Sequence, residues 1–228
     1  MKLKHIALLF LTLLPPGQVT AEVPTASPVI VDHDTVHLNR LHEKSRNSTV
    51  KIITNMGHGS GTYVKIGRNF GILTAAHVVA QGNHFIVEAG TRQTVGTLIW
   101  KNEEADLAFL MVEKIPVIEP VRMRARNNIS VGDEVVYSGF PSTHEMLTFS
   151  CIISNPDYQG RLILQGFAWF GASGSGFINA RGDVIAVLSA VTVENFYGHP
   201  QVLETMVIGS MLTDSHIDEI RNAVDAVP

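Results

Sequence analysis

The feature that most constrains the fold is a series of short runs, rich in β-branched residues, that follow one another along most of the chain. Glycine or asparagine separates many of these runs, a pattern typical of strands in an all-β barrel or sandwich. The expected strands are residues 49–53, 62–66, 70–74, 84–88, 94–100 and 107–112 in a first set, and 134–138, 147–153, 161–165, 176–179, 184–190 and 201–208 in a second set. We therefore predict an all-β fold with two β-barrels.

Helical spacing is convincing only near the C-terminus, where apolar residues between Asp214 and Ala226 fall on one face of a helix. Ser215, followed three residues later by Asp218, is the expected cap of this helix. A weaker pattern predicts a short helix over residues 35–46. The expected organisation is a signal peptide over 1–21, an N-terminal arm with the short helix over 22–47, a first barrel over 48–120, a second barrel over 121–212 and a C-terminal helix over 213–228.

Composition narrows the classes of function. The chain has 228 residues, of which 45% are hydrophobic and 17% charged, a proportion that supports a packed core and argues against disorder or a coiled coil. The formal charge of −4 gives no reason to expect nucleic acid or an anionic membrane as a partner. The single cysteine, Cys151, excludes an intrachain disulfide and a cysteine-based zinc site. His33 and His37 lack the glutamate of a zinc-protease helix, so we expect no metal and no cofactor.

The first residues have the pattern of a secretory signal peptide. Lys2 and Lys4 precede an apolar run, Ile6–Leu14, and small residues follow up to Ala21. The run is far shorter than the roughly 20 residues that span a bilayer, which favours a cleaved signal over the alternative, an uncleaved anchor. We therefore expect a secreted or periplasmic protein that leaves the membrane after cleavage, and the lack of paired cysteines suggests a bacterial one.

One glycine-rich segment carries a candidate nucleophile, Ser173, within Gly171–Gly176. A serine between glycines on a turn between strands has an exposed hydroxyl and little packing value. Glycines permit positive φ angles, which let the N–H groups of Gly171 and Ser173 converge on one point where an oxyanion can bind. The alternative is a hairpin turn without chemistry.

A histidine and an aspartate complete the candidate chemistry. His77 follows two alanines at the end of a β-branched strand, and its imidazole suits a general base, although a structural histidine is the alternative. Asp106 lies in an apolar strand, where burial is costly unless the carboxylate accepts hydrogen bonds, as it does when it orients a histidine. The order His77, Asp106, Ser173 is that of the chymotrypsin-like triad and not the Ser–acid–His order of α/β-hydrolases.

The three blocks Thr74–His77, Asp106–Ala108 and Gly171–Gly174 resemble the signature blocks of trypsin-like serine proteases. The chain is most similar to their disulfide-free bacterial branch, the Deg-type (high-temperature-requirement) proteases and the glutamyl endopeptidases. Gly57–Thr62 resembles the glycine–serine–glycine turn of their first barrel. The segment after residue 210 is too short for the PDZ domain of typical Deg-type chains. The resemblance implies two six-stranded antiparallel β-barrels with the active site between them.

The resemblance also implies roles for single residues. His77 would be the general base, Asp106 the carboxylate that orients it, and Ser173 the acylated nucleophile, with the N–H groups of Gly171 and Ser173 as oxyanion donors. Residues expected to bind substrate are Phe167 and Ala168, in the wall or floor of the primary specificity pocket, and Ser189, Ala190 and Val191, as a strand that pairs with the peptide. No acid stands at positions 167–168, so we expect a preference for a medium apolar residue over Arg or Lys.

We therefore expect a secreted or periplasmic serine endopeptidase that cleaves polypeptides through an acyl-enzyme on Ser173. One alternative is a catalytically silent module of the same fold that binds peptides or a partner protein. Another is a latent enzyme, because Phe167, Trp169 and Phe170 crowd the approach to Ser173. Nothing in the sequence indicates an oligomeric state.

Overall fold

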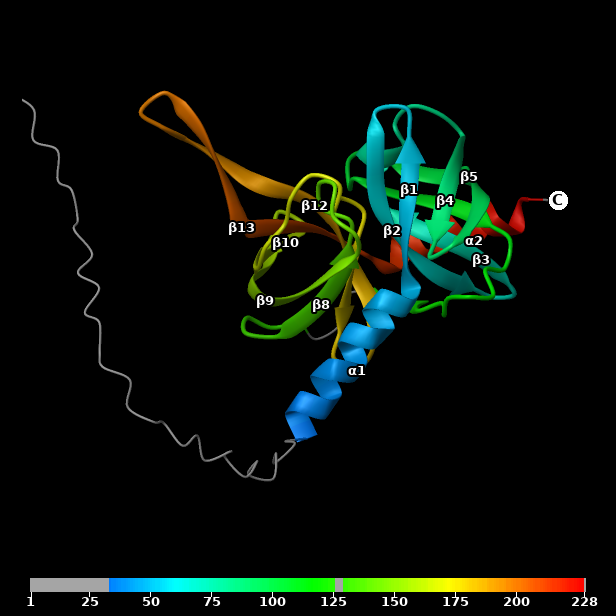
Figure 1. Ribbon diagram of the computed structural model, residues 1–228, viewed down its shortest axis with the longest axis horizontal. Coiled ribbons are helices and arrows are strands. Elements are labelled where there is room, and N and C mark those ends of the chain that lie inside the picture. Colours follow the sequence, from blue (N-terminus) through cyan, green and yellow to red (C-terminus); the bar gives the residue numbers. More distant parts are fainter. Residues whose placement is uncertain (1–32, 126–128, 228) are drawn as a thin grey trace, which may run out of the picture. The chain divides into compact units, whose positions relative to one another are not determined.

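The computed structural model describes residues 33–125 and 129–227, and its first barrel is closed by six antiparallel strands (Figure 1). The strands are β1 (Thr49–Thr54), β2 (Gly57–Ile66), β3 (Asn69–Thr74), β4 (His84–Ala89), β5 (Arg92–Asn102) and β6 (Leu107–Val112), in the spatial order β1-β2-β3-β6-β5-β4. Buried Phe85, Val87 and Ala89 alternate with more exposed residues along β4, so every second side chain enters the barrel. The interior is filled by large apolar side chains such as Tyr63 and Leu110.

The second barrel also has six antiparallel strands, in the order β11-β8-β9-β10-β13-β12, and pairing of β11 with β12 closes it. The strands are β8 (Glu134–Gly139), β9 (Leu147–Tyr158), β10 (Arg161–Gln165), β11 (Gly176–Asn179), β12 (Asp183–Phe196) and β13 (His199–Met211). A two-residue strand, β7 (Arg122–Met123), adds to β12 in parallel. The all-β fold of two six-stranded barrels is thus confirmed.

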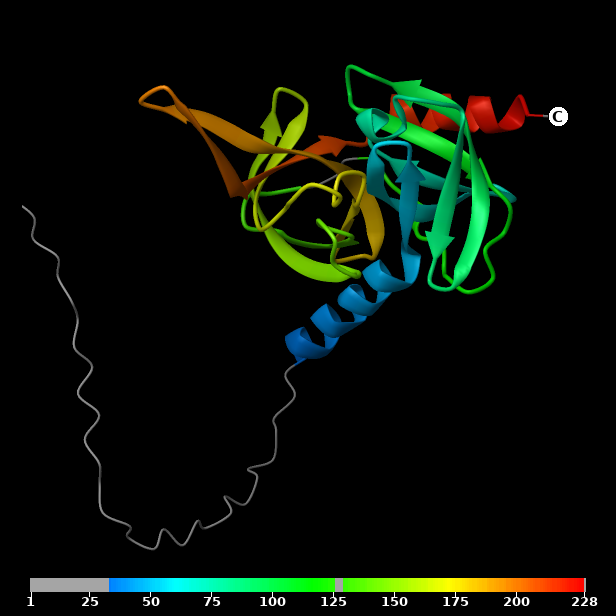
Figure 2. The same ribbon diagram turned by 45° about the horizontal axis from the view of Figure 1, so that its top comes forward.

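A third apolar cluster lies between the barrels and under both helices. It joins Val64 and Phe109 of the first barrel to Val136 and Val187 of the second. Leu41 reaches it from α1 (His33–Ser48), and Ile220 from α2 (Asp214–Asp225). The α1 helix packs on β8 of the second barrel, whereas α2 packs on β5 of the first (Figure 2). Each helix therefore covers the barrel to which it is not directly joined in sequence.

The helices differ in detail from the expectation. The α1 helix runs from His33 to Ser48, beyond both ends of the predicted 35–46. The α2 helix is capped by Thr213 and not by Ser215: the Thr213 hydroxyl accepts a hydrogen bond from the backbone N–H of His216, at 3.2 Å. No helix in the described part of the chain is long and apolar enough to cross a membrane. The predicted signal peptide and the start of the N-terminal arm lie outside the described residues.

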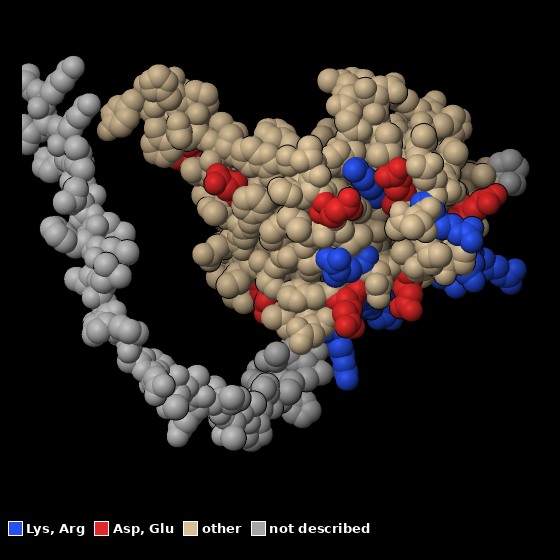
Figure 3. All heavy atoms as spheres, viewed as in Figure 1, with Lys and Arg blue, Asp and Glu red and all other residues tan. Residues whose placement is uncertain are grey.

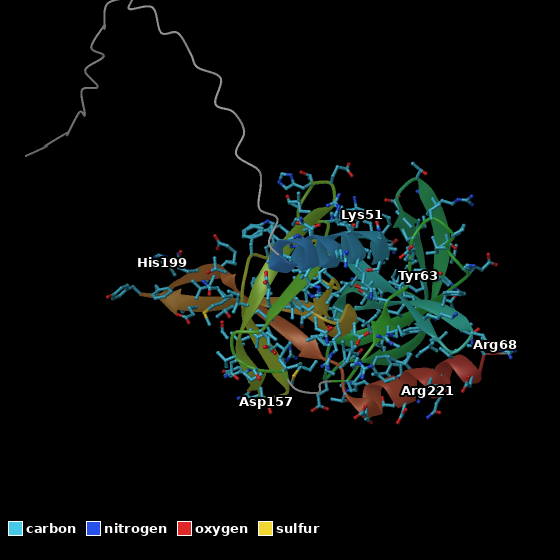
Figure 4. The ribbon with its side chains drawn as sticks, turned by 90° about the horizontal axis from the view of Figure 1, so that it is seen from below. Lys51, Tyr63, Arg68, Asp157, His199 and Arg221 are labelled. Carbon is cyan, nitrogen blue, oxygen red and sulfur yellow. The ribbon has the colours of Figure 1, made fainter. Side chains whose placement is uncertain are left out.

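The last two strands are longer than predicted. The pattern indicates strands over 184–190 and 201–208, whereas β12 covers Asp183–Phe196 and β13 covers His199–Met211. The two form a hairpin that projects from the second barrel (Figures 1 and 4), with His199 at its far end. Polar residues such as Glu194 and Asn195 hide the strand pattern in this part, because neither face is buried there.

Candidate active site

His77 lies just beyond the end of β3, on a short 3-10 helix, η1 (Ala76–Val79). The sequence suggested a position at the end of the strand, but β3 ends at Thr74. Ala75 and Ala76 are buried, while the His77 side chain is 48% exposed. The small alanines thus let the chain turn sharply and leave the imidazole accessible at the surface.

Asp106 is found in the turn before β6 and not inside the strand, as the sequence suggested. Its φ of +53° is in the left-handed region, which aspartate tolerates better than most residues. Its Oδ2 is 2.9 Å and its Oδ1 3.1 Å from Nδ1 of His77, and Oδ1 also accepts the His77 backbone N–H at 3.0 Å. Because a carboxylate only accepts, Nδ1 of His77 carries the proton and Nε2 is left free to accept one.

The second barrel reaches the same carboxylate through Ser189 of β12. The Ser189 hydroxyl donates a short hydrogen bond to Oδ2 of Asp106. Arg161, at the start of β10, donates to the Ser189 hydroxyl at 3.3 Å and to the carbonyl of Glu104 at 3.3 Å. Burial acts to raise the pKa of Asp106, but the hydrogen bonds from the His77 side chain, Ser189 and the His77 backbone, with the charge of His77, together hold that pKa below its usual value.

Ser60 of β2 holds the loop that carries Ser173 against the first barrel. Its backbone N–H donates to the carbonyl of Ser173 and its hydroxyl donates to the carbonyl of Gly171, both at 2.8 Å. The hydroxyl of Thr74 donates to the carbonyl of Ser60 at 2.8 Å. Gly174 has a φ of +92°, and a Cβ there would lie 2.0 Å from the Ser60 carbonyl oxygen, so only glycine fits. The sequence suggested Gly57–Thr62 as a turn, by family resemblance alone, whereas these residues form the first half of β2 and pair with β1. Their role in holding the serine loop was missed.

The two predicted oxyanion donors of the loop are free to bind a ligand. Within the described residues, no acceptor takes the backbone N–H of Gly171 or of Ser173. The N–H groups on the other side of each donor are used: Ala172 donates to Trp169, Gly174 to Leu188, Ser175 to Ala172 and Gly176 to the Thr62 hydroxyl. The two free donors are the pair that the sequence predicts for an oxyanion site.

Gly171 is confined by its surroundings as well as by its φ of +94°. A Cβ there would lie 2.4 Å from the carbonyl oxygen of Phe140 and 2.7 Å from Nε2 of His58. His58 Nε2 is itself 2.7 Å from that carbonyl oxygen, and Ser142 donates its N–H to the carbonyl of Phe170 at 2.6 Å. His58 and Ser142 therefore border the peptide that precedes Gly171, a contact that sequence order does not reveal.

Both halves of the candidate site pack against one glycine of β2. A Cβ on Gly59 would lie 2.5 Å from Cγ1 of Val78, the residue after His77, and 3.3 Å from the carbonyl oxygen of Ser173. The structure therefore brings η1 and the serine loop together. Within the described chain, no hydrogen bond joins the Ser173 hydroxyl to His77.

Of the two residues predicted to form the specificity pocket, Phe167 is partly exposed and Ala168 is buried. Phe167 is 39% exposed, its ring centroid is 5.4 Å from that of Phe149, and its carbonyl accepts the hydroxyl of Tyr137 at 2.5 Å. The Ala168 side chain is fully buried in the core of the second barrel, and its N–H donates to the carbonyl of Glu204 at 3.0 Å. An acidic residue, Glu204 of β13, therefore lies next to the expected pocket wall, where the local sequence shows none.

The aromatic residues before Ser173 are turned to solvent. Trp169 is 38% and Phe170 is 70% exposed, and their rings meet edge to face with centroids 5.4 Å apart. Cys151 is buried against Gly166, and burial raises the pKa of its thiol to about 12. Its neutral thiol acts as a core side chain and not as a nucleophile.

Comparison with known proteins is in accord with this geometry. Residues 59–187 match the model of the trypsin-like peptidase domain. The chain is 24% identical to the serine protease Rv3671c of Mycobacterium tuberculosis over 198 residues, which is 80% of this chain and 49% of the relative. It is 23% identical to a probable periplasmic serine protease, Do/HhoA-like, of Haemophilus influenzae, over 59% of this chain and 31% of the relative. The chain thus spans about half the length of the mycobacterial relative.

Solved structures show the same fold. A serine endoprotease from Yersinia pestis superimposes with a TM-score of 0.67 at 18% identity, covering 82% of this chain and 66% of that one. The inactive form of a serine-to-alanine mutant of Rv3671c from M. tuberculosis superimposes with a TM-score of 0.63 at 21% identity, covering 90% of this chain and 98% of that one.

Proposed function

Since the chain belongs to the trypsin-like peptidase domain family, we propose that it is a serine endopeptidase that cleaves polypeptides through an acyl-enzyme on Ser173. The observation that carries the proposal is the carboxylate of Asp106, which accepts hydrogen bonds from both the ring and the backbone of His77. These bonds set the tautomer in which Nε2 of His77 can take a proton. The free N–H groups of Gly171 and Ser173 would stabilise the negative charge that develops on the carbonyl oxygen of the substrate.

In the proposed reaction, the Ser173 oxygen forms a bond to the scissile carbonyl carbon while Nε2 of His77 takes the hydroxyl proton. The electron pair of the carbonyl π-bond moves to its oxygen, which the N–H groups of Gly171 and Ser173 stabilise. His77 then gives the proton to the leaving nitrogen as the C–N bond breaks. Water hydrolyses the resulting ester by the same route, and Asp106 stays ionised throughout.

A fluorophosphonate probe tests the proposal, because it reacts with an activated serine and leaves a mass tag. We expect one adduct, on Ser173, and loss of both the adduct and proteolysis in Ser173→Ala with an unchanged circular dichroism spectrum. Ser175→Ala is the matched control, because Ser175 belongs to the same loop but is fully buried. Labelling or proteolysis that persists in Ser173→Ala would contradict the assignment.

A second candidate, a latent form of the enzyme, is favoured by the lack of a hydrogen bond between the Ser173 hydroxyl and His77 within the described residues. A latent enzyme would react with the probe only when a peptide or partner is added. Labelling of the wild-type protein alone excludes latency. No labelling under any condition would favour the silent, peptide-binding module.

The specificity pocket is a separate proposal. We propose that the wall at Phe167 and Ala168 accepts a medium apolar side chain before the scissile bond. A peptide library should show this preference directly. Profiles dominated by Arg or Lys would contradict it and would make Glu204, the acidic neighbour of Ala168, the residue to substitute next.

We also propose that the protein acts outside the cytoplasm, secreted or in a periplasm. The support is the signal-like pattern of residues 1–21 and the similarity to a relative whose name describes it as periplasmic. Mass spectrometry of the protein recovered from a cell-envelope or culture fraction should find Glu22 as the first residue. An intact Met1 in the membrane fraction would instead indicate an uncleaved anchor.

A further inference from the structure

The hairpin of β12 and β13 extends well beyond what closing the second barrel requires. Among the described strands, residues 192–203 pair only with each other, from Thr192 opposite Leu203 to Phe196 opposite His199. Val193 is 58%, Phe196 47% and Tyr197 fully exposed. A two-stranded ribbon with no packed face is marginally stable in water, so a segment of this kind gains from a third strand. Figures 2 and 4 show it standing free of the barrels.

One edge of this hairpin starts at the candidate catalytic serine. Up to Leu188 the outer edge of β12 is occupied: Leu188 donates its N–H to Ser175 and accepts the N–H of Gly174. From Ala190 to Phe196 no strand within the described residues pairs with that edge. The unpaired edge is therefore continuous with the segment Ser189–Val191, the proposed partner of the peptide next to the scissile bond.

The two edges of the hairpin are not equally open. Lysine and proline on an edge strand prevent pairing with another chain. Strand β13 carries Pro200 near its tip, which lacks an N–H, whereas β12 has neither lysine nor proline along its length. The more open edge is thus that of β12, the strand that starts beside the serine loop and runs away from it.

The charged side chains of the hairpin are all acidic. Between Asp183 and Met211 there is no lysine or arginine, and Figure 3 shows no basic side chain on the face of the hairpin in view. Asp183 is buried and paired, which leaves Glu194 and Glu204 as the accessible carboxylates. Glu194 lies five residues after Ser189 on the open edge. If the substrate residue just before the scissile bond lies opposite Ser189, an added antiparallel strand places its sixth upstream residue opposite Glu194.

We propose that the free edge of β12 over residues 190–196 binds the substrate upstream of the scissile bond as an added β-strand, and that Glu194 favours a basic side chain about six residues upstream. The inference rests on the proposed function, because the upstream direction follows from cleavage at Ser173. Backbone hydrogen bonds along the edge would supply affinity, and Glu194 selectivity. The substrate class is a polypeptide with an extended segment before the cleavage site and a basic side chain at its sixth residue.

Quenched fluorescent peptides with one common cleavage sequence test the proposal. One series extends four and another eight residues upstream, and the longer peptides carry Lys or Glu at the sixth position. We expect kcat/KM to rise about tenfold from the short to the long lysine peptide, which corresponds to ~1.4 kcal/mol. Glu194→Lys should reverse the preference between the Lys and Glu peptides. Glu113→Lys, an exposed change on the first barrel, should leave it as in the wild type.

Backbone pairing is tested without changing the protein. N-methylation of alternate amides in the upstream half of the long peptide should abolish the gain, while methylation of the intervening amides, which face away from the edge, should preserve most of it. Equal rates for short and long peptides would overturn the proposal, even where the short peptide is cleaved and Ser173 is labelled. Failure of the proposed function would instead remove cleavage and labelling together.

If a second copy of the chain or a lipid surface, and not a substrate, occupied the free edge of β12, other measurements would show it. A second copy of the chain would make the sedimentation coefficient depend on protein concentration, and Val193→Pro would abolish that dependence. A lipid surface would retain the protein on neutral phosphatidylcholine vesicles through Phe196 and Tyr197. Either finding, combined with equal rates for short and long peptides, assigns the hairpin to that occupant and overturns the substrate proposal.

Discussion

At the scale of single residues, Asp106 is one of the side chains that connect the two barrels inside the candidate site. It binds His77 from the first barrel and Ser189 from the second. The sequence identified it by a wrong premise, a buried acid within a strand, but its left-handed turn presents the carboxylate to both partners. Its chemistry was therefore predictable from residue type and order, whereas its geometry was not.

Asp106→Asn separates charge from backbone conformation, because asparagine also tolerates a positive φ. We expect kcat to fall by about four orders of magnitude, since the amide favours the wrong tautomer of His77. A carboxyl group with a lowered pKa stabilises the folded state above its ordinary pKa of about 3.9, and this contribution is lost as the pH falls through the folded pKa. The difference in unfolding free energy between the wild type and Asp106→Asn should therefore be larger at pH 6 than at pH 3, as measured by urea titration. An advantage independent of pH would contradict this role.

Ser60→Ala tests the residue that holds the serine loop. The change removes the bond to Gly171 and leaves the N–H of Phe140 without its 3.0 Å partner. We expect about 1–3 kcal/mol lower stability and a slower rate of fluorophosphonate labelling at Ser173. Ser45→Ala is the matched control, because the buried hydroxyl of Ser45 has no hydrogen-bond partner among the residues that the structure describes. Equal labelling rates in the two variants would refute a positioning role for Ser60.

At the scale of elements, most strands were predicted well where burial alternates, and poorly at the end of β12, where burial stops. β2 is an exception: it begins at Gly57 and not at residue 62, although Gly59–Gly61 are buried, because a glycine-rich segment does not have a strand pattern. The boundaries of β6, β10 and β11 agree with the prediction to the residue, because buried apolar side chains continue along the length of these strands. The outer part of β12 was missed because Thr192–Phe196 contacts no core. The same lack of burial that hid this segment from the sequence pattern makes it available to a partner.

The α2 cap gives a prediction of its own. Thr213→Ala removes the hydroxyl that accepts the N–H of His216, and we expect a loss of about 1 kcal/mol in unfolding free energy. Ser215→Ala, at the cap that the sequence suggested, should change the free energy of unfolding by a few tenths of a kcal/mol, because that exposed hydroxyl bonds the exposed side chain of Glu219. Thermal unfolding of the two variants decides between the caps: a greater loss in Ser215→Ala would restore the original assignment.

At the scale of the whole molecule, the connection between the barrels is anchored to both of them. Val121 donates its N–H to Tyr63 of the first barrel. Arg122 and Arg124 then pair with the buried carboxylate of Asp183 on β12, at 3.0 and 2.9 Å. Together with the crossed packing of the two helices, this fixes the barrels so that Asp106 meets Ser189.

Asp183→Ala should destabilise the described domain by about 1.5–3 kcal/mol, because the charged hydrogen bonds to Arg122 and Arg124 are lost, while both guanidinium groups are exposed enough to stay hydrated. Arg122→Ala should cost clearly less, since Arg124 still neutralises the carboxylate and Arg122 is 71% exposed. Urea unfolding of both variants measures the difference. Similar losses in the two variants would show that Arg124 alone does not satisfy the carboxylate.

The sequence by itself determined the fold class and the identity of the candidate triad, because strand periodicity, glycine punctuation and the order of His77, Asp106 and Ser173 are local properties of the chain. Only the tertiary structure decided which other residues share the site. Ser60 and His58 come from β2, Arg161 from β10 and Glu204 from β13. Closure of the two barrels places Ser60 and His58 beside the serine loop, Arg161 beside Ser189, and Glu204 beside the expected pocket wall. The open edge of β12 also belongs to the folded molecule alone, because an edge is defined by the strands that do not pair with it.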